Sequence, residues 1–204
     1  MNAVVALSRL RKLGVPALDT ADAAAALGLT VAAASQTLAR LAQAGLLLRV
    51  RHGTWWLEGP IDPLRLPEYL TAPFPAYVSL QTALHRHGLI EQIPEVIYVV
   101  SLGRTQRVTT KVAPFSIHHV APEVFGGFVE TEHGAKLATA EKALFDVAYL
   151  SSGRSRLFAR LPELELPRGF KRKELGRWIA RVPSDRSRAR TARKLEELLA
   201  TGRR

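Results

Sequence analysis

The segment from Thr20 to Leu57 limits the possible folds more than any other part of the chain. It reads TADAAAALGLTVAAASQTLARLAQAGLLLRVRHGTWWL. Two helix-favouring stretches end at Gly28 and Gly45, and glycine readily takes the left-handed conformation that closes a helix. Thr20 and Thr30 precede the two stretches, where a hydroxyl accepts the first free N–H groups. The pattern predicts two short helices followed by a β-hairpin built from LLLRV, RHG and TWWL.

The second of these helices is expected to have one apolar and one polar face. Its apolar residues recur at intervals of three and four: Val31, Ala34, Leu38 and Leu41. The opposite face carries small or hydrogen-bonding side chains and no carboxylate: Ala33, Gln36, Thr37, Arg40 and Gln43. A surface that enters the DNA major groove needs this composition, because phosphates repel carboxylates while arginine and glutamine pair with guanine and adenine edges.

The hairpin that follows is basic at its tip. Arg49, Arg51 and His52 lie around Gly53, where a wing would contact the DNA backbone or the minor groove. Two helices and a basic hairpin in this order predict an N-terminal winged helix-turn-helix, and DNA binding is the function that this fold favours. The alternative is an Ala-rich helical hairpin without this role, and winged helices also serve protein contacts.

A proline-rich stretch divides the chain. Five prolines lie between Pro60 and Pro75, and because proline lacks an N–H donor and blocks helix propagation, we expect an extended, irregular linker. The 204 residues are enough for two small domains. We therefore predict an α+β protein with a winged helix over residues 1–59, a linker over 60–75, and a mixed α/β C-terminal domain with a helical, basic end over 76–204.

The C-terminal domain is expected to combine helices with short strands. Ser79 is a candidate cap for the helix LQTALHRHG, and Thr139 for the helix AEKALFDVAYL. The other expected elements are strands over 95–102, 112–120, 128–131 and 136–138, a polar turn over 103–110 and a last helix over 187–200. Lys142 and Asp146 are four residues apart, and we expect them to pair on the exposed helix face, worth only a few tenths of a kcal/mol.

The positive charge of the chain is concentrated near its end. The net charge is +11, and thirteen of the 29 Lys and Arg residues but only four of the 18 acidic residues follow Pro167. Such a segment favours a polyanion or an acidic protein surface, and a solvated basic helix is the alternative. The candidate contacts to DNA or to a protein partner outside the first domain are Arg104, Arg107, Lys171, Arg172 and Lys173.

The sequence offers no catalytic or metal-binding motif. No Asp or Glu is followed two residues later by Lys, the spacing usual in restriction-type nucleases. Glu130 and Glu132 share a predicted strand face, which more often is solvated surface. His118 and His119 are adjacent on a predicted strand and face opposite ways, and cysteine is absent. We therefore expect no metal, no cofactor and no enzymatic activity.

Segments beyond the first domain point to a family. AYVSLQTALHRHGLIEQIPEVIYVVS, a basic turn and KLATAEKALFDVAYL follow one another. Together with the N-terminal winged helix, this order resembles the abortive-infection antitoxins of the AbiEi type, with SLQTALHRHGLI and TAEKALFDVAYL carrying most of the resemblance. The resemblance extends to about residue 175. It implies a protein encoded beside a nucleotidyltransferase-like toxin, whose N-terminal domain represses its own operon at inverted repeats. The C-terminal domain would counteract the toxin and assist repression.

The resemblance also assigns roles to residues. It implies a recognition-helix role for Gln36, Thr37 and Arg40, and a wing role for Arg49, Arg51 and His52. We therefore expect a cytoplasmic antitoxin that binds double-stranded operator DNA, opposes the toxin directly or indirectly, and does not act at a membrane. The alternatives are a stand-alone repressor with a ligand-sensing C-terminal domain and a metal-dependent nuclease.

Overall fold

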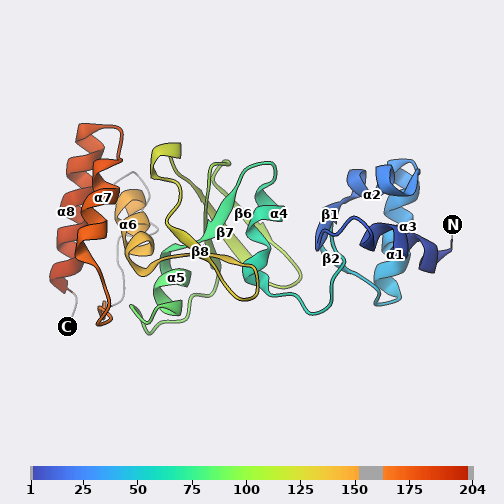
Figure 1. The fold of residues 1–204 in the computed structure, drawn as a ribbon, viewed down its shortest axis with the longest axis horizontal. Coiled ribbons are helices and arrows are strands. Elements are labelled where there is room, and N and C mark those ends of the chain that lie inside the picture. The colour runs from blue at the N-terminus through green and yellow to red at the C-terminus, as the bar shows by residue number, and fades with distance from the viewer. Residues whose placement is uncertain (1, 152–162, 202–204) are drawn as a thin grey trace. The chain divides into compact units, whose positions relative to one another are not determined.

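The computed structural model describes residues 2–151 and 163–201 (Figure 1). Helices and two β-sheets are distributed along the chain, so the mixed α+β class predicted from the sequence is confirmed. The chain divides into two compact units: residues 1–63 with 109–113, and residues 64–108 with 114–204. No helix in the described ranges is long and apolar enough to cross a lipid bilayer.

The first unit combines three helices with a three-stranded sheet. Its elements are α1 (Ala3–Arg11), β1 (Ala17–Asp19), α2 (Thr20–Leu27), α3 (Val31–Gln43), β2 (Leu48–Arg51) and β3 (Thr54–Trp56). β3 is the central strand and pairs antiparallel with both β1 and β2. The sequence pattern did not predict β1, because three residues are too few to show a period and the partner strand lies far along the chain.

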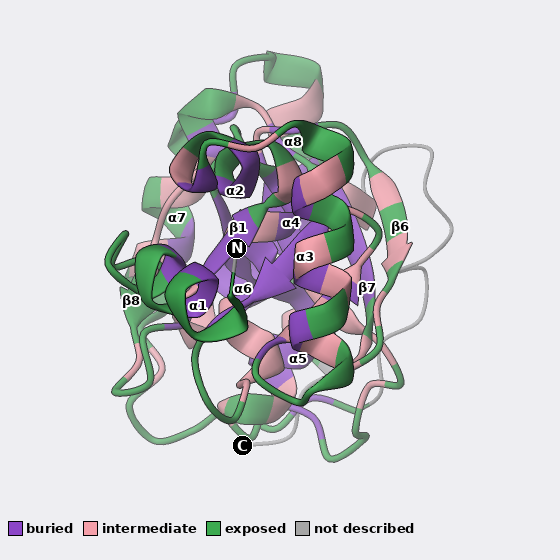
Figure 2. Cartoon of the chain, turned by 90° about the vertical axis from the view of Figure 1, so that its right-hand side faces the viewer, coloured by how far each residue is buried: buried purple, intermediate pink, exposed green. Residues whose placement is uncertain are grey.

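One cluster of buried apolar side chains holds this unit together. Leu10 of α1, Leu27 of α2 and Leu38 of α3 meet Trp55 of β3 in this core. Burying a side chain of this size contributes about 1.5–3 kcal/mol. Along α3 buried and exposed residues alternate with the helical period (Figure 2). Val31 shares the apolar face by spacing but is exposed, so the buried face of α3 begins one turn later than predicted.

The helix caps are mostly those that the sequence predicts. Gly28 ends α2 in the left-handed conformation, with φ at 66°. Thr30 caps α3 by accepting a hydrogen bond from Ala33 N at 3.3 Å. The prediction that Thr20 caps α2 is wrong, since the Asp19 carboxylate accepts from the third residue of the helix. Thr20 is already helical, and its hydroxyl serves the hairpin instead.

The proline-rich stretch is more regular than predicted. It contains a 3-10 turn, η1 (Pro63–Arg65), and a short helix, α4 (Pro67–Thr71). Pro67 occupies the first position of α4, where a missing N–H group removes no helical hydrogen bond. Leu66 and Leu70 are buried. The expectation of an extended stretch over residues 60–75 is therefore wrong at α4, which belongs to the second unit.

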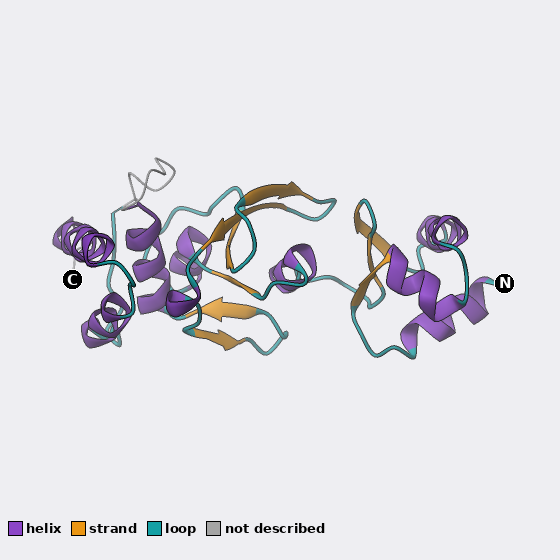
Figure 3. Cartoon of the chain, turned by 90° about the horizontal axis from the view of Figure 1, so that it is seen from above, coloured by secondary structure: helices purple, strands orange, loops and turns teal. Residues whose placement is uncertain are grey.

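The second unit is built around a six-stranded sheet (Figure 3). Its strands are β4 (Ala76–Val78), β5 (Ile97–Ser101), β6 (Gln106–Thr109), β7 (Pro114–His119), β8 (Phe128–Glu130) and β9 (Lys136–Ala138). Their order in space is β6-β7-β5-β4-β9-β8. β4 runs antiparallel to β5 and parallel to β9, β5 runs parallel to β7, and β8 runs antiparallel to β9. β4 therefore lies inside the sheet, and all three of its residues are buried.

Four longer helices of this unit pack together, and one of them, α6, contacts the other three. They are α5 (Leu80–Arg86), α6 (Ala140–Ser151), α7 (Arg172–Ala180) and α8 (Asp185–Thr201), and a 3-10 turn, η2 (Pro122–Val124), precedes β8. α6 contacts α5 and β9 on one side and α7 and α8 on the other (Figure 1). Its residues from 142 to 148 are all buried, as expected for a helix enclosed on opposite sides.

Three local predictions for this unit are wrong. The range 103–110 is not only a turn, because Gln106–Thr109 form the edge strand β6, where half-exposed polar residues are well tolerated. Ser79 precedes α5 but makes no capping hydrogen bond with its side chain. β8 ends at Glu130, so Glu132 lies in the following turn and the two carboxylates do not share a strand face.

Candidate functional site

The exposed face of α3 carries the residues that the sequence singles out. Gln36, Arg40 and Gln43 are exposed, whereas Ala33 and Thr37 are half-buried. The Thr37 hydroxyl donates a hydrogen bond to the Ala33 carbonyl at 2.9 Å, so its proton is already used within the helix. Within the described ranges, the guanidinium of Arg40 has no carboxylate partner. The face is thus polar, uncharged except for one cation, and available to a ligand.

The β2–β3 hairpin places its basic residues in different settings. Gly53 takes a left-handed φ of 80° at the tip, next to exposed His52. The Arg49 guanidinium lies over the Trp55 ring, 5.4 Å from its centroid, and Arg51 Nε donates to Thr54 Oγ1 at 3.1 Å. Both arginines are half-buried and held in place, while His52 extends from the tip.

A small network fixes the hairpin to α2. Trp55 Nε1 donates to Thr20 Oγ1 at 2.9 Å, and Thr20 Oγ1 donates to the Gly53 carbonyl at 3.3 Å. The Thr20 N–H also donates to that carbonyl, at 2.9 Å. These hydrogen bonds fix the position of the hairpin tip relative to the start of α2. A fixed position is needed if the helices and the hairpin are to contact one ligand at the same time.

The remaining candidate cations belong to the second unit. Arg104 and Arg107 are exposed beside and on the edge strand β6. Lys171, Arg172 and Lys173 are exposed at the start of α7. The structure thus brings Arg49, Arg51 and His52 into one unit with α3, and places the other five cations in two separate segments of the other unit.

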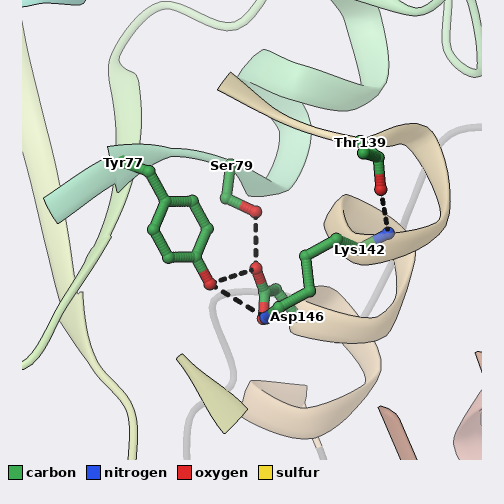
Figure 4. Close-up of polar contacts among 5 residues, drawn as sticks. All are labelled: Tyr77, Ser79, Thr139, Lys142 and Asp146. Atoms are coloured by element: carbon green, nitrogen blue, oxygen red, sulfur yellow. Dashed lines mark hydrogen bonds and ion pairs between the residues drawn. The ribbon is translucent and has the colours of Figure 1, made fainter. Parts of the chain in front are cut away.

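The second unit also contains a buried polar cluster that the sequence analysis missed (Figure 4). Tyr77 Oη and Ser79 Oγ donate to Asp146 Oδ2 at 3.0 and 2.7 Å. Lys142 Nζ donates to Tyr77 Oη at 2.9 Å and forms an ion pair with Asp146 Oδ1. The Lys142 and Asp146 side chains are 0% exposed. The cluster joins strand β4 to helix α6 across the interior of the unit.

Burial controls the electrostatics of this cluster. Desolvation lowers the pKa of Lys142 and raises the pKa of Asp146, and the attraction between the two groups opposes both shifts. Desolvation, followed by the charge of Asp146, raises the pKa of Tyr77 well above its ordinary value. The Lys142 ammonium also lies 4.7 Å from the ring centroid of Trp178 on α7. Because both charged side chains are 0% exposed and pair with each other, the cluster is an internal connection between β4 and α6.

The expectation that Lys142 and Asp146 pair on an exposed face is wrong. They lie in the run KALFDVA, in which every residue is buried. Apolar residues occur all round this helix, and such a helix is enclosed by its surroundings. That signal was present in the sequence, but it did not identify Tyr77 of β4 or Ser79, which follows this strand, because both lie more than sixty residues earlier.

Four of the six histidines make hydrogen-bond contacts within the second unit: His85, His87, His118 and His119. His118 and His119 face opposite ways as predicted: His118 is buried and His119 is exposed. His118 Nε2 lies 2.9 Å from Ser116 Oγ, and His87 Nε2 lies 2.7 Å from the Ala138 carbonyl. Across residues 2–151 and 163–201, no group of three or more histidines or acidic residues is arranged to hold a metal ion.

His118 gives the second unit a pH-dependent stability. Burial, with the charge of Arg107 as a smaller contribution, lowers the pKa of His118 from 6.5 to about 4. Between these two pH values only the unfolded chain binds the proton, so we expect the contribution of His118 to the free energy of unfolding to be constant above about pH 6.5 and to fall as the pH falls towards 4. Urea titrations at several pH values measure this effect.

A substitution separates this histidine from the other titrating groups. In His118→Phe, the decline between pH 6.5 and 4 is expected to become shallower than in the wild type. His119→Phe, on the exposed neighbour, is the matched control and is expected to leave the slope unchanged. Equal slopes of unfolding free energy against pH in the wild type and in His118→Phe would contradict this prediction. They would show that His118 binds its proton equally well in the folded and the unfolded chain.

Comparison with known proteins gives no match to a family model and no match to a curated protein. The resemblance to the AbiEi antitoxins therefore stays a prediction. Function has to be inferred from the residues and the geometry described above.

Proposed function

We propose that the protein is a DNA-binding transcriptional regulator whose first unit is a winged helix-turn-helix. In this proposal α2 and α3 form the helix-turn-helix, α3 is the recognition helix, and the β2–β3 hairpin is the wing. The observation that carries the proposal is the exposed face of α3, which presents Gln36, Arg40 and Gln43 without a carboxylate on the whole helix.

Each part of this surface suits one kind of DNA contact. An exposed arginine and glutamine on a helix pair with guanine and adenine edges in the major groove. Thr30 caps the start of α3, and the positive end of a helix dipole favours a nearby phosphate. His52 at the hairpin tip extends towards backbone or minor groove, while Arg49 is oriented by Trp55. Base contacts on α3 would specify sequence, and the wing would fix orientation.

The particular regulator that we propose is an antitoxin of the AbiEi type. It would repress its own operon by covering the promoter at inverted repeats, in the cytoplasm, and its second unit would counteract a nucleotidyltransferase-like toxin. The order of the segments SLQTALHRHGLI and TAEKALFDVAYL supports this proposal. In the structure these segments form α5 and α6, which pack against each other in the core of the second unit.

Binding of the purified full chain to the DNA upstream of its own gene tests the proposal. We expect binding that survives an excess of random DNA and maps to an inverted repeat. Affinity should fall as salt rises, because phosphate contacts release counterions. Binding that is equally weak on all sequences would contradict a role as a specific repressor. A separate experiment tests the antitoxin role: expression of the chain should restore the growth of cells that express the toxin encoded by the neighbouring gene.

Arg40→Ala is expected to weaken binding to the operator by about 1–3 kcal/mol and to relax the base preference at one position. The physical reason is the loss of a bidentate contact to a base edge. Fluorescence anisotropy with the operator and with single-base variants of it measures both effects. Arg40 is exposed and free of partners within residues 2–151 and 163–201, so the folded state should be unaffected.

Arg86→Ala on α5 is the matched control for Arg40→Ala. It removes the same charge from an exposed helical position of the second unit. We expect operator affinity to stay within about twofold of wild type, since Arg86 belongs to none of the elements that we propose to contact DNA and salt screens the field of an exposed charge. If Arg40→Ala lowers affinity equally on operator and random DNA, Arg40 contacts phosphate and does not read a base.

A further inference from the structure

A cavity opens where the chain enters α7. Its volume is about 670 Å³, and its walls come from the segment between Leu166 and Arg177. Cavities of 300–1,000 Å³ are typical of sites for small organic ligands. The cavity lies within the second unit and contains no residue of α3 or of the β2–β3 hairpin. Three of the candidate cations from the sequence, Lys171, Arg172 and Lys173, line it.

One side of the cavity is apolar and fixed. Leu166 and Phe170 line it, and both are half-buried because they pack against the core of the second unit. Pro167 lies between them in sequence and also lines the cavity. A rigid apolar surface that includes an aromatic ring is suited to a flat ring of a ligand.

The other side is strongly cationic. Arg168, Lys171, Arg172 and Lys173 line the cavity, and all four are exposed. None of their side chains forms an ion pair or hydrogen bond with a carboxylate in the described part of the chain. The acidic residue of the lining, Glu174, is already paired with Arg177 at 2.7 Å. This surplus of positive charge favours an anion, and arginine forks match phosphate oxygens.

The charge that attracts the anion comes from side chains rather than from the end of α7. The N–H group of Lys171 donates to Glu141 Oε1 at 2.7 Å, so this backbone donor is already occupied. Four cationic side chains line the cavity, from the three consecutive positions 171–173 and from Arg168.

We propose that this cavity binds a nucleotide. The base packs against Leu166 and Phe170, and the phosphate groups interact with Arg168, Lys171 and Arg172. A ligand with only carboxylates or phosphates would leave the apolar side in contact with water, and a purely apolar ligand would leave the cations unused. The nucleotide is either free or the phosphorylated end of a single strand, which present the same chemistry. This site is independent of the proposed DNA surface.

Titration of the full chain with three probes tests the site: ATP, tripolyphosphate and a short 5′-phosphorylated single-stranded RNA. We expect saturable binding of ATP or of the RNA, and weaker binding of tripolyphosphate. Lys171→Gln/Arg172→Gln should weaken nucleotide binding about tenfold or more, as the loss of charge-assisted contacts predicts. The matched control is Arg186→Gln/Arg190→Gln on α8, an equal loss of charge at exposed positions, which should leave affinity within about twofold.

Phe170→Leu tests the apolar side without changing the charge. It should weaken ATP binding and leave tripolyphosphate binding unchanged, because only the nucleotide has a base. An unchanged melting temperature shows that Phe170→Leu keeps its fold. Tighter binding of ATP than of the RNA assigns the site to a free nucleotide, and the reverse order assigns it to a strand end.

Three outcomes would overturn the proposal. The first is that neither ATP nor the RNA binds saturably. The second is that tripolyphosphate binds as tightly as ATP and Phe170→Leu changes neither, which makes the cavity a general polyanion surface. The third is that Lys171→Gln/Arg172→Gln weakens only duplex DNA binding, which assigns these cations to DNA.

Discussion

Lys142→Ala is expected to lower the free energy of unfolding by about 3–5 kcal/mol. The side chain is 0% exposed, and its removal leaves the Asp146 carboxylate buried without its ion-pair partner. The substitution also removes the contacts of the ammonium with three aromatic rings, whose centroids lie 4.7–5.4 Å from Nζ: Tyr77, Phe145 and Trp178. Most single-domain proteins have a total stability of about 5–15 kcal/mol, so the second unit would be close to unfolding.

Urea unfolding followed by circular dichroism measures the effect, and two further variants interpret it. Lys142→Met/Asp146→Leu removes both charges and should recover part of the loss, because an uncompensated charge no longer remains. The recovery of stability should be incomplete, since the hydroxyl groups of Tyr77 and Ser79 lose the carboxylate that accepts their hydrogen bonds.

The control for the ion pair itself lies on α8. Arg193 and Glu197 have the same i,i+4 spacing, but their side chains are 77% and 54% exposed. Arg193→Ala should cost less than about 0.5 kcal/mol, as is usual for exposed pairs. If Lys142→Ala costs no more than Arg193→Ala, Lys142 is solvated in solution and the buried cluster does not form.

Gly127→Ala is expected to destabilise the second unit by about 2–5 kcal/mol, through two separate effects. Its φ of 72° is left-handed, and a non-glycine residue there is strained by about 1–2 kcal/mol. A Cβ atom at this position would also collide with Trp178 Cζ2 and lie 2.9 Å from Lys142 Cγ. Overpacking of this kind costs a further 1–3 kcal/mol or so.

Gly88→Ala separates strain from collision. Gly88 has the same φ of 72°, in the same unit, and a Cβ atom there would meet nothing within 4 Å. The cost of Gly88→Ala should therefore be the strain alone, about 1–2 kcal/mol. Thermal and urea unfolding of the two variants give the comparison. Equal costs at both positions would mean that Trp178 does not pack against Gly127.

Local rules predicted the features that depend on neighbouring residues. Gly28, Thr30 and Thr139 end or cap helices as expected, since a left-handed glycine or a capping hydroxyl acts within one helical turn. The exposed positions of Gln36 and Arg40 follow from the helical period in the same way. These predictions need no knowledge of the rest of the chain.

Features that depend on distant partners were not predictable in this way. Thr20 is the first residue of α2, which Asp19 caps, and its hydroxyl accepts a hydrogen bond from Trp55 of strand β3. Lys142 and Asp146 have the spacing of a surface pair, and only the enclosure of α6 from opposite sides makes them a core element. The candidate cations near residues 104 and 171 were identified by charge alone, and charge does not say which segments lie together.

The buried cluster has a consequence for the order of events during synthesis. The hydrogen bond from Tyr77 of β4 to Asp146 cannot form before α6 has been synthesised. The contact of the Lys142 ammonium with the Trp178 ring cannot form before α7 has been synthesised. Contacts between segments so far apart close large loops, which slows folding. A chain that ends before α7 therefore lacks the ring contact that Trp178 makes with the Lys142 ammonium. The surroundings of the buried cluster are thus complete only after α7 has been synthesised, late in translation of the second unit.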